Sequence, residues 1–267
     1  SNWYSASPTV ISACWDSSTG WKAKSVKTHD NATIATEDIA DEAVTGAKAV
    51  NLGRRNLIIN GAMQVAQRGT SQTTSGYGSI DRMPLSLSGA IATMTQETLP
   101  VGQTDLPSQF RKFARFATTT GNNNCGLYHR IEDVDTAEGQ VVLSFYAKGT
   151  NPASGSFETF LYQDFGSGGS SGVHTPREPF VVTSSWQRFE FLVTLPSLSG
   201  KTIGTGSSIE VNVIQQNADT GTAAWTLDLT GIQLEVGDTA TPFEHRSYGE
   251  ELSLCQRYTQ LNAAAYF

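Results

Sequence analysis

Residues 225–237 read WTLDLTGIQLEVG and have the pattern of one long β-strand. Apolar side chains fall on every second residue, first at Trp225, Leu227 and Leu229, then at Ile232, Leu234 and Val236. The period of two slips by one residue at Gly231, which predicts a β-bulge there. Because such a strand buries one face, it needs a second sheet to pack against. The stretch therefore predicts an antiparallel β-sandwich and disfavours a helical fold.

The rest of the chain repeats the strand signal at short intervals. β-Branched and aromatic residues, separated by Gly, Asn, Ser or Pro, predict strands at residues 90–97, 109–118, 126–134, 140–149, 157–165, 186–195, 209–216 and 225–236. This number and spacing favour an all-β fold, an antiparallel jelly-roll sandwich. Trp186 and Trp225 begin apolar strands and are expected in the core. Residues 248–261 place Leu252, Cys255 and Tyr258 at helical spacing, which predicts one short helix.

Composition and charge exclude several partners. The chain has 267 residues, 25 of them Gly, and a net charge of −7 with 16% charged residues. An acidic chain without a basic stripe is not expected to bind duplex nucleic acid. It shows no apolar run of membrane-spanning length and no signal-peptide pattern, so we expect no membrane insertion. Cys14, Cys125 and Cys255 lack paired or metal-like spacing, which predicts free thiols in a protein made in a reducing cytoplasm.

The first 30 residues are rich in large aromatic side chains, namely Trp3, Tyr4, Trp15 and Trp21. Residues 8–16 and 18–26 have the pattern of two short strands around a Ser-Ser-Thr-Gly turn. The segment could be a hairpin that caps the main domain. Because aromatic clusters in so short a segment usually need a partner, we favour a docking element that attaches the protein to a larger assembly.

Residues 31–53 repeat apolar residues with a step of five, at Ile34, Ile39, Val44 and Ala49. A step of five follows neither one face of a helix nor one face of a strand. It fits a chain that winds about an axis shared with copies of itself, and we expect a short trimeric neck. The alternative is a short amphipathic helix that begins at Thr36, with Glu37 and Asp38 in its first turn.

An ordered set of short motifs resembles a known group of proteins. These are NLIING at residues 56–61, RIEDV at 130–134, VVLSFYAKG at 141–149, FGSGGS at 165–170, WQR at 186–188, QLEVG at 233–237, TPFE at 241–244 and LCQRY at 254–258. Together they resemble the carboxy-terminal jelly-roll domain of phage tail-fibre and related virion proteins.

The resemblance carries several expectations for this chain. It implies a homotrimeric virion fibre or spike, a fold similar to carbohydrate-binding modules, an opening strand at residues 56–69, no cofactor and no catalytic residues. The domains would be a virion-attachment segment at 1–30, the neck at 31–53 and the jelly roll at 54–267. The partners would be other copies of the chain, other virion proteins and a host-surface polysaccharide.

Two groups of residues are candidates for sugar binding, because sugar rings stack on aromatic faces and need polar groups beside them. The first is Tyr162, Gln163, Asp164 and His174, around the loop 165–174. The second is Tyr77, Asp81 and Arg82. Each has an alternative interpretation. Strand alternation would turn Phe160 and Tyr162 into the core, and Asp81 with Arg82 could form a structural ion pair.

No motif predicts a metal site or catalysis. Glu132, Asp133, Asp135 and Glu138 resemble a calcium loop only in part, since the usual order of ligands is missing, and a solvated turn is favoured. The glycine-rich residues 166–172 lack the Lys-Ser/Thr ending and the following helix of a phosphate loop, so we expect the end of a hairpin. The chain shows no nucleophile elbow and no identifiable carboxylate pair, and is not expected to be an enzyme.

Two functions follow from these observations. The first is a receptor-binding virion fibre whose jelly roll adheres to a host-surface glycan. The second is a purely structural virion decoration or connector, in the tail or the head, that never meets a receptor. A weaker third possibility is a free carbohydrate-binding module of an extracellular enzyme.

Overall fold

The computed structural model describes residues 12–16, 20–24, 55–89, 91–120, 124–153, 155–215 and 224–259. The chain divides into two compact units, Ser1–Gly53 and Arg54–Phe267. In the first unit, β1 (Ser12–Asp16) and β2 (Gly20–Lys24) pair as an antiparallel hairpin with Trp15 opposite Trp21, which confirms the two strands predicted there. Trp3, Tyr4, Ile34, Ile39 and Val44 lie outside the described residues.

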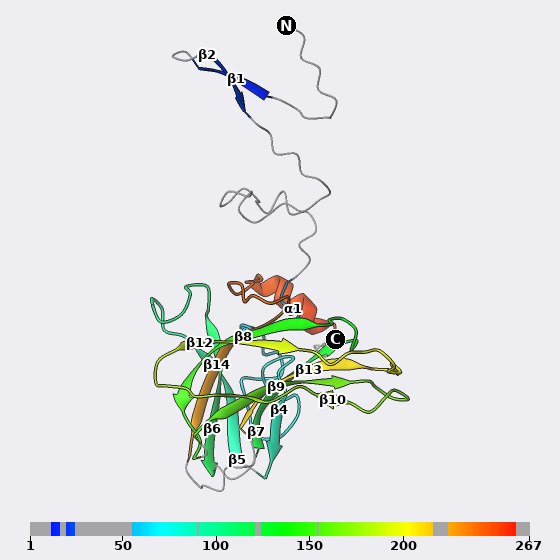
Figure 1. Ribbon diagram of the computed structural model, residues 1–267. Coiled ribbons are helices and arrows are strands. Elements are labelled where there is room, and N and C mark those ends of the chain that lie inside the picture. The colour runs from blue at the N-terminus through cyan, green and yellow to red at the C-terminus, as the bar shows by residue number, and fades with distance from the viewer. Residues whose placement is uncertain are drawn as a thin grey trace, which may run out of the picture. The chain divides into compact units, whose positions relative to one another are not determined.

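The second unit is a sandwich of two antiparallel sheets packed face to face, as the jelly-roll prediction requires (Figure 1). The β14 sheet has the order β12-β8-β14-β6-β5-β3, and the β9 sheet has the order β10-β9-β13-β7-β4 with β11 also on β9. The strands are β3 (Ser71–Gln72), β4 (Leu85–Ser88), β5 (Ile91–Thr98), β6 (Lys112–Thr120), β7 (Asn124–Glu132), β8 (Gln140–Thr150), β9 (Phe157–Asp164), β10 (Val173–His174), β11 (Glu178–Phe180), β12 (Gln187–Thr194), β13 (Ser208–Gln215) and β14 (Thr226–Val236).

All eight long strands predicted from the sequence are present within a few residues of their predicted ends. Their order in the sheets is not their order in the chain. β13 lies between β9 and β7, and β14 lies between β8 and β6, so the chain crosses repeatedly from one sheet to the other. These crossovers bring residues far apart in sequence onto one face.

β14 is the central strand of its sheet, and its predicted bulge is confirmed. The register with β8 shifts between Thr230 and Gln233, and Gly231 has a φ of 65°, which glycine adopts at low cost. A Cβ at Gly231 would lie 2.8 Å from the ring of Phe110. The bulge keeps both apolar sets of the strand buried, although Val236, at its end, is 61% exposed.

The core between the sheets is built around aromatic rings. Phe157 packs on the edge of Trp225 at 5.1 Å between ring centroids, and Phe180 contacts both Phe145 and Phe157. Trp225 is buried, as predicted. Trp186 is only half-buried and lies outside this core, where its ring meets Phe113 at 5.5 Å.

A second apolar cluster covers the outer side of the β14 sheet. It consists of Ala62, Leu99, Leu106, Phe110, Phe113 and Phe243, with Tyr146 and Trp186 packed against it. Residues 99–110 and the segment around Phe243 thus shield this face from solvent. The β14 sheet is therefore buried over much of both sides.

The strand expected at residues 56–69 is wrong, because that segment has no regular structure. Asn60 has a φ of 62° and Met63 a φ of 57°, values that a strand does not allow. The fully buried side-chain amide of Asn60 forms hydrogen bonds in place of those that a paired strand would make. Its nitrogen donates to the carbonyls of Val65 and Asp81, and its oxygen accepts from the Val65 N–H. Side-chain hydrogen bonds hold this opening segment together with single backbone hydrogen bonds, from the Leu57 N–H to the Leu234 carbonyl and from the Ile232 N–H to the Gly61 carbonyl.

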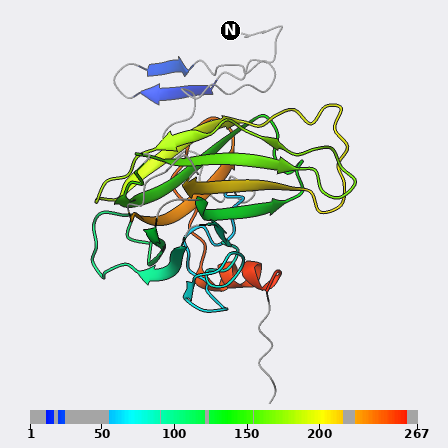
Figure 2. The ribbon, with the colours of Figure 1, turned by 90° about the horizontal axis from the view of Figure 1, so that it is seen from below.

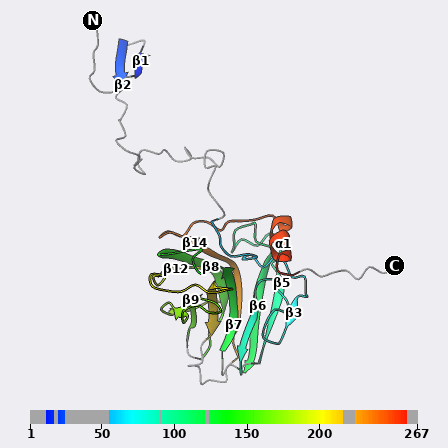
Figure 3. The ribbon, with the colours of Figure 1, turned by 90° about the vertical axis from the view of Figure 1, so that its right-hand side faces the viewer.

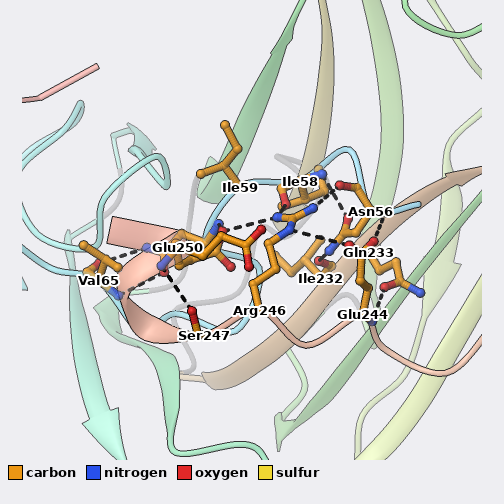
Figure 4. Close-up of polar contacts among 12 residues, drawn as sticks. Asn56, Ile58, Ile59, Val65, Ile232, Gln233, Glu244, Arg246, Ser247 and Glu250 are labelled. Atoms are coloured by element: carbon orange, nitrogen blue, oxygen red, sulfur yellow. Dashed lines mark hydrogen bonds and ion pairs between the residues drawn. The ribbon is translucent and has the colours of Figure 1, made fainter. Parts of the chain in front are cut away.

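A buried polar network ties the opening segment to the closing motifs of the chain (Figure 4). Asn56 donates to the carbonyl of Ile232 in the bulge and accepts from the N–H groups of Ile58 and Leu234. The guanidinium of Arg246 donates to the carbonyls of Ile58 and Asn56. Asn56 of the NLIING motif thus contacts Leu234 of the QLEVG motif.

The network ends on α1 (Tyr248–Gln256), the helix predicted near the end of the chain, which lies beside the opening segment (Figures 2 and 3). Ser247 caps the helix by accepting from the Glu250 N–H. Glu251, on its first turn, pairs with Arg246 at 3.2 Å and accepts from the Asn60 N–H at 2.9 Å. Cys255 is buried and free, as is Cys125.

Replacement of Arg246 by Met should destabilise the protein strongly. The side chains of Arg246 and Glu251 are 4% and 3% exposed, so the variant leaves a buried carboxylate without its cation. We expect a loss of about 3–5 kcal/mol in the free energy of unfolding, measured by urea denaturation.

Arg257→Met is the matched control for this measurement. It removes an exposed ion pair with Glu132, whose side chain is 47% exposed, and should change the free energy of unfolding by less than about 1 kcal/mol. Equal, small effects of the two substitutions would show that the buried network does not hold the fold.

Candidate functional site

The outer face of the β9 sheet carries polar and aromatic side chains. β9 alternates strictly: Phe157, Thr159, Leu161 and Gln163 are buried toward the other sheet, whereas Glu158, Phe160, Tyr162 and Asp164 point outward. Gln163 is fully buried and its amide donates to the Pro196 carbonyl. Its prediction as a ligand contact is therefore corrected, because no ligand on the outer face can reach it.

Strand register aligns outward residues of four strands into rows. His174 of β10 lies opposite Tyr162 of β9, Tyr162 lies opposite Glu210 of β13, and Glu210 lies opposite Arg130 of β7. The next row places Phe160, Asn212 and Tyr128 side by side. We call this surface the platform, defined by Tyr128, Arg130, Phe160, Tyr162, His174, Glu210 and Asn212.

Tyr162 and His174 form the aromatic part of the platform. Their rings are stacked, with centroids 4.4 Å apart and planes 28° apart. Tyr162 is half-buried and His174 exposed, so neither belongs to the core between the sheets. Phe160 also points outward, but the guanidinium of Arg177 lies over its ring at 4.1 Å and leaves it 6% exposed. Of the two outward rings of β9, Tyr162 is therefore more accessible than Phe160.

The polar part of the platform is already organised. Arg130 pairs with Glu210 at 2.9 Å, and the Asn212 amide donates to the same carboxylate at 3.1 Å. The Tyr128 hydroxyl is a neutral hydrogen-bond donor near neutral pH, as its ordinary pKa of 10 already implies, and partial burial raises that pKa further. The surface thus offers hydroxyl, amide and carboxylate groups beside aromatic rings.

Two pockets that share Tyr77, Arg82 and Tyr258 adjoin the platform at Arg130, and we call them together the arginine cleft. Its lining comprises Arg68, Tyr77, Arg82, Arg130, Glu132, Asp164, Gly206, Ser207, Ser208, Tyr258 and Thr259. The fold thus brings Tyr77 and Arg82, from one predicted group, together with Asp164 from the other. Tyr77 is 41% exposed.

Asp81, the remaining predicted residue, does not reach the cleft. It is 1% exposed and accepts from the backbone N–H of Gln67 at 3.1 Å. Arg82 turns the other way, where it donates to the Arg130 carbonyl and lies 3.6 Å from the Tyr258 ring centroid. The prediction of Asp81 as a ligand contact is corrected, and the alternative of an Asp81–Arg82 ion pair is wrong as well.

The acidic residues after β7 form the solvated turn that was favoured for them. Asp133, Asp135 and Glu138 are exposed, and Glu132 pairs with Arg257 at 2.5 Å. Within the described part of the chain, no group of three or more His, Cys, Asp or Glu side chains is arranged to hold a metal ion.

Sequence reasoning missed Tyr128, Glu210, Asn212, Arg68 and Tyr258 as members of these surfaces. Alternation along β7 and β13 marks the first three as facing away from the core. No local sequence pattern, however, predicts that β13 pairs with both β7 and β9. The platform therefore exists only through the non-local register.

Comparisons with known proteins found only partial likeness. No protein-family model matches the chain, and no curated protein matches it. Among solved structures, a carbohydrate-binding module of the β-sandwich superfamily has a TM-score of 0.41 and 12% identity, over 61% of this chain and 61% of that one. The enzymatically active domain of tailspike protein 4 of bacteriophage CBA120 has a TM-score of 0.41 and 12% identity, over 68% of this chain and 21% of that one.

A cyclase from Fischerella sp. TAU has a TM-score of 0.46 and 8% identity, over 71% of this chain and all of that one. These partial likenesses identify neither a family nor a ligand for this chain. Within the described residues, no helix is long and apolar enough to span a membrane.

His129, on the inner side of β7, makes stability depend on pH. Burial, aided by the charges of Arg82 and Arg246, lowers the pKa of His129 to about 3 from an ordinary 6.5. Between these values the unfolded chain binds a proton that the native state does not. The free energy of unfolding therefore falls as the pH drops below about 6.5, by up to about 1.4 kcal/mol per pH unit from this group.

His129→Gln tests this dependence, because it removes the titrating group and keeps an acceptor for the Ile59 N–H. Urea denaturation at about pH 7 and about pH 5 should show a smaller acid-induced loss of stability in the variant than in the unchanged protein. Equal losses in the two proteins would contradict the assignment.

Proposed function

We propose that this chain is a homotrimeric phage virion fibre or spike whose jelly roll binds a host-surface glycan on the platform without cleaving it. Residues 1–30 attach it to the particle and residues 31–53 form the trimeric neck. The ordered motifs of the sequence support the virion assignment, and the surface chemistry of the β9 sheet supports the glycan.

One observation carries the glycan proposal, namely the row His174, Tyr162, Glu210 and Arg130 on the outer face of the β9 sheet. Sugar rings present C–H faces that stack on aromatic rings, and hydroxyls that bind amides, carboxylates and guanidinium groups. The rings of Tyr162 and His174 supply the aromatic surface for stacking. The hydrogen-bonding groups come from Glu210, Arg130 and Asn212, which lie one or two strands away from Tyr162, at about 4.8 Å per strand.

Three copies of one weak site suit a fibre. A single shallow platform is expected to bind with low affinity, because it encloses little of its ligand. Trimerisation converts the second and third contacts with one polysaccharide into intramolecular steps, which raises the overall affinity when the sites can engage together. Adhesion then needs no deep pocket.

Tyr162→Ala should weaken glycan binding. The change removes the stacking ring, and we expect affinity for polysaccharide from the host surface to fall by about tenfold or more, measured by calorimetry or glycan arrays. The matched control is Tyr248→Ala, which truncates a tyrosine that is 56% exposed on α1 and should leave affinity unchanged. If the unchanged protein binds no host glycan, the structural decoration role replaces adhesion.

The trimer is tested through the neck. In sedimentation experiments the full chain should have a mass three times that of one chain, which is 28.7 kDa. Combined substitution of Ile34, Ile39 and Val44 by Ser should shift it toward single chains, since these residues supply the repeated apolar contacts. Ile203→Ser, at a residue 45% exposed in the larger unit, should have no such effect. An unchanged protein that sediments as a monomer would remove the basis for the neck.

A further inference from the structure

The arginine cleft contains a cation, Arg82, that forms no ion pair with the described residues. Arg82 is only 8% exposed. Its Nε is buried without a hydrogen-bond partner in the described part of the chain. Buried charges are normally paired, so an unpaired guanidinium at a cleft indicates a missing anion.

The backbone of Arg82 is also held in an unusual conformation. Its φ is 67°, in the left-handed region that non-glycine residues rarely occupy. Such conformations cost free energy and persist where the surrounding structure enforces them, often at ligand sites. Here the contacts that fix the side chain are the Arg130 carbonyl, which accepts from Arg82, and the ring of Tyr258 beneath the guanidinium.

A second arginine faces the same space. Arg68 donates to the Thr259 hydroxyl and lies 5.7 Å from the ring centroid of Tyr77. Among the described residues, the part of the cleft lined by Arg68, Tyr77, Arg82, Tyr258 and Thr259 contains no acidic side chain. In a chain with a net charge of −7, two arginines and two tyrosines without a carboxylate form a local site of opposite sign.

The acidic groups near the cleft lie on the side of the platform. There Glu132 is paired with Arg257 at 2.5 Å, and Asp164 accepts from the Gly166 N–H at 3.0 Å. Arg130 is paired with Glu210. Both Glu132 and Asp164 line the cleft beside Arg82, so they favour an anion at the Arg68 end, farther from the platform.

We propose that the arginine cleft binds an oxyanion carried by a sugar residue, a carboxylate or a phosphate, and thus that the glycan recognised on the platform is acidic. This inference rests on the proposed function and names the class of its ligand. The planar guanidinium fork matches either anion, and the rings of Tyr77 and Tyr258 line the space for the sugar that carries it.

The direct test observes the Arg82 Nε–H by NMR in the full chain, with the signal assigned through Arg82→Lys. Glucuronate, glucose 6-phosphate and glucose are titrated separately to millimolar concentration. We expect a saturable shift of this signal with glucuronate, with glucose 6-phosphate or with both, and none with glucose. The pattern tells carboxylate from phosphate. No saturable shift with either anion overturns the inference.

Substitutions give a second readout that does not depend on a buried position. Arg68→Gln removes an exposed cation at the cleft and should weaken anion binding about tenfold. The control Arg111→Gln removes an equal charge from an exposed loop elsewhere and should have no effect on the titration. Equal weakening in both variants would indicate only the loss of overall charge, and would also overturn the inference.

The two proposals fail separately. If Tyr162→Ala abolishes binding of a neutral glycan while the Arg82 signal never responds to anions, the platform stands and the acidic ligand does not. If the Arg82 signal responds but no glycan depends on Tyr162, the cleft binds an anion and the platform is not the adhesion surface.

Discussion

The buried guanidinium of Arg246 is the contact on which the rest of the larger unit depends. It joins the opening segment at Ile58 to α1 at Glu251, while Asn56 joins the same segment to the bulge of β14. None of these links is a strand pairing. The register with β8 shifts at the bulge around Gly231, and there the opening segment satisfies backbone groups of β14. The Asn56 side chain bonds the Ile232 carbonyl and the Leu234 N–H, and the Gly61 carbonyl accepts from the Ile232 N–H.

This arrangement covers one outer face of the sandwich. The opening and closing segments of the larger unit both lie against β14. Together with residues 99–110, they form the second apolar cluster on the outer side of the β14 sheet. The outer face of the β9 sheet keeps half-exposed Tyr162 and Tyr128 and the ion pair of Arg130 with Glu210. The outer face of the β9 sheet therefore leaves partly exposed aromatic rings beside polar groups.

The sequence predicted the strands well and the pairing poorly. Alternation in β14 predicted the bulge, because burial on one face constrains every second residue locally. The family resemblance implies a strand at residues 56–69, but Asn60 forms local hydrogen bonds that compete with strand pairing. For Gln163 the same alternation that identified the strand could have shown an inward direction. The meeting of Tyr77, Arg82 and Asp164 depends on sheet order, which no local pattern contains.

The central claim is that ligands meet this chain on the outer face of the β9 sheet. Hydrogen–deuterium exchange of the full chain, with and without polysaccharide from the host surface, tests it most directly. The account predicts slower exchange in β9, β10 and β13 when the polysaccharide is present, and unchanged exchange rates in the β14 sheet. Protection confined to β12, β8 or α1, or no protection anywhere under conditions where the polysaccharide binds, would contradict it.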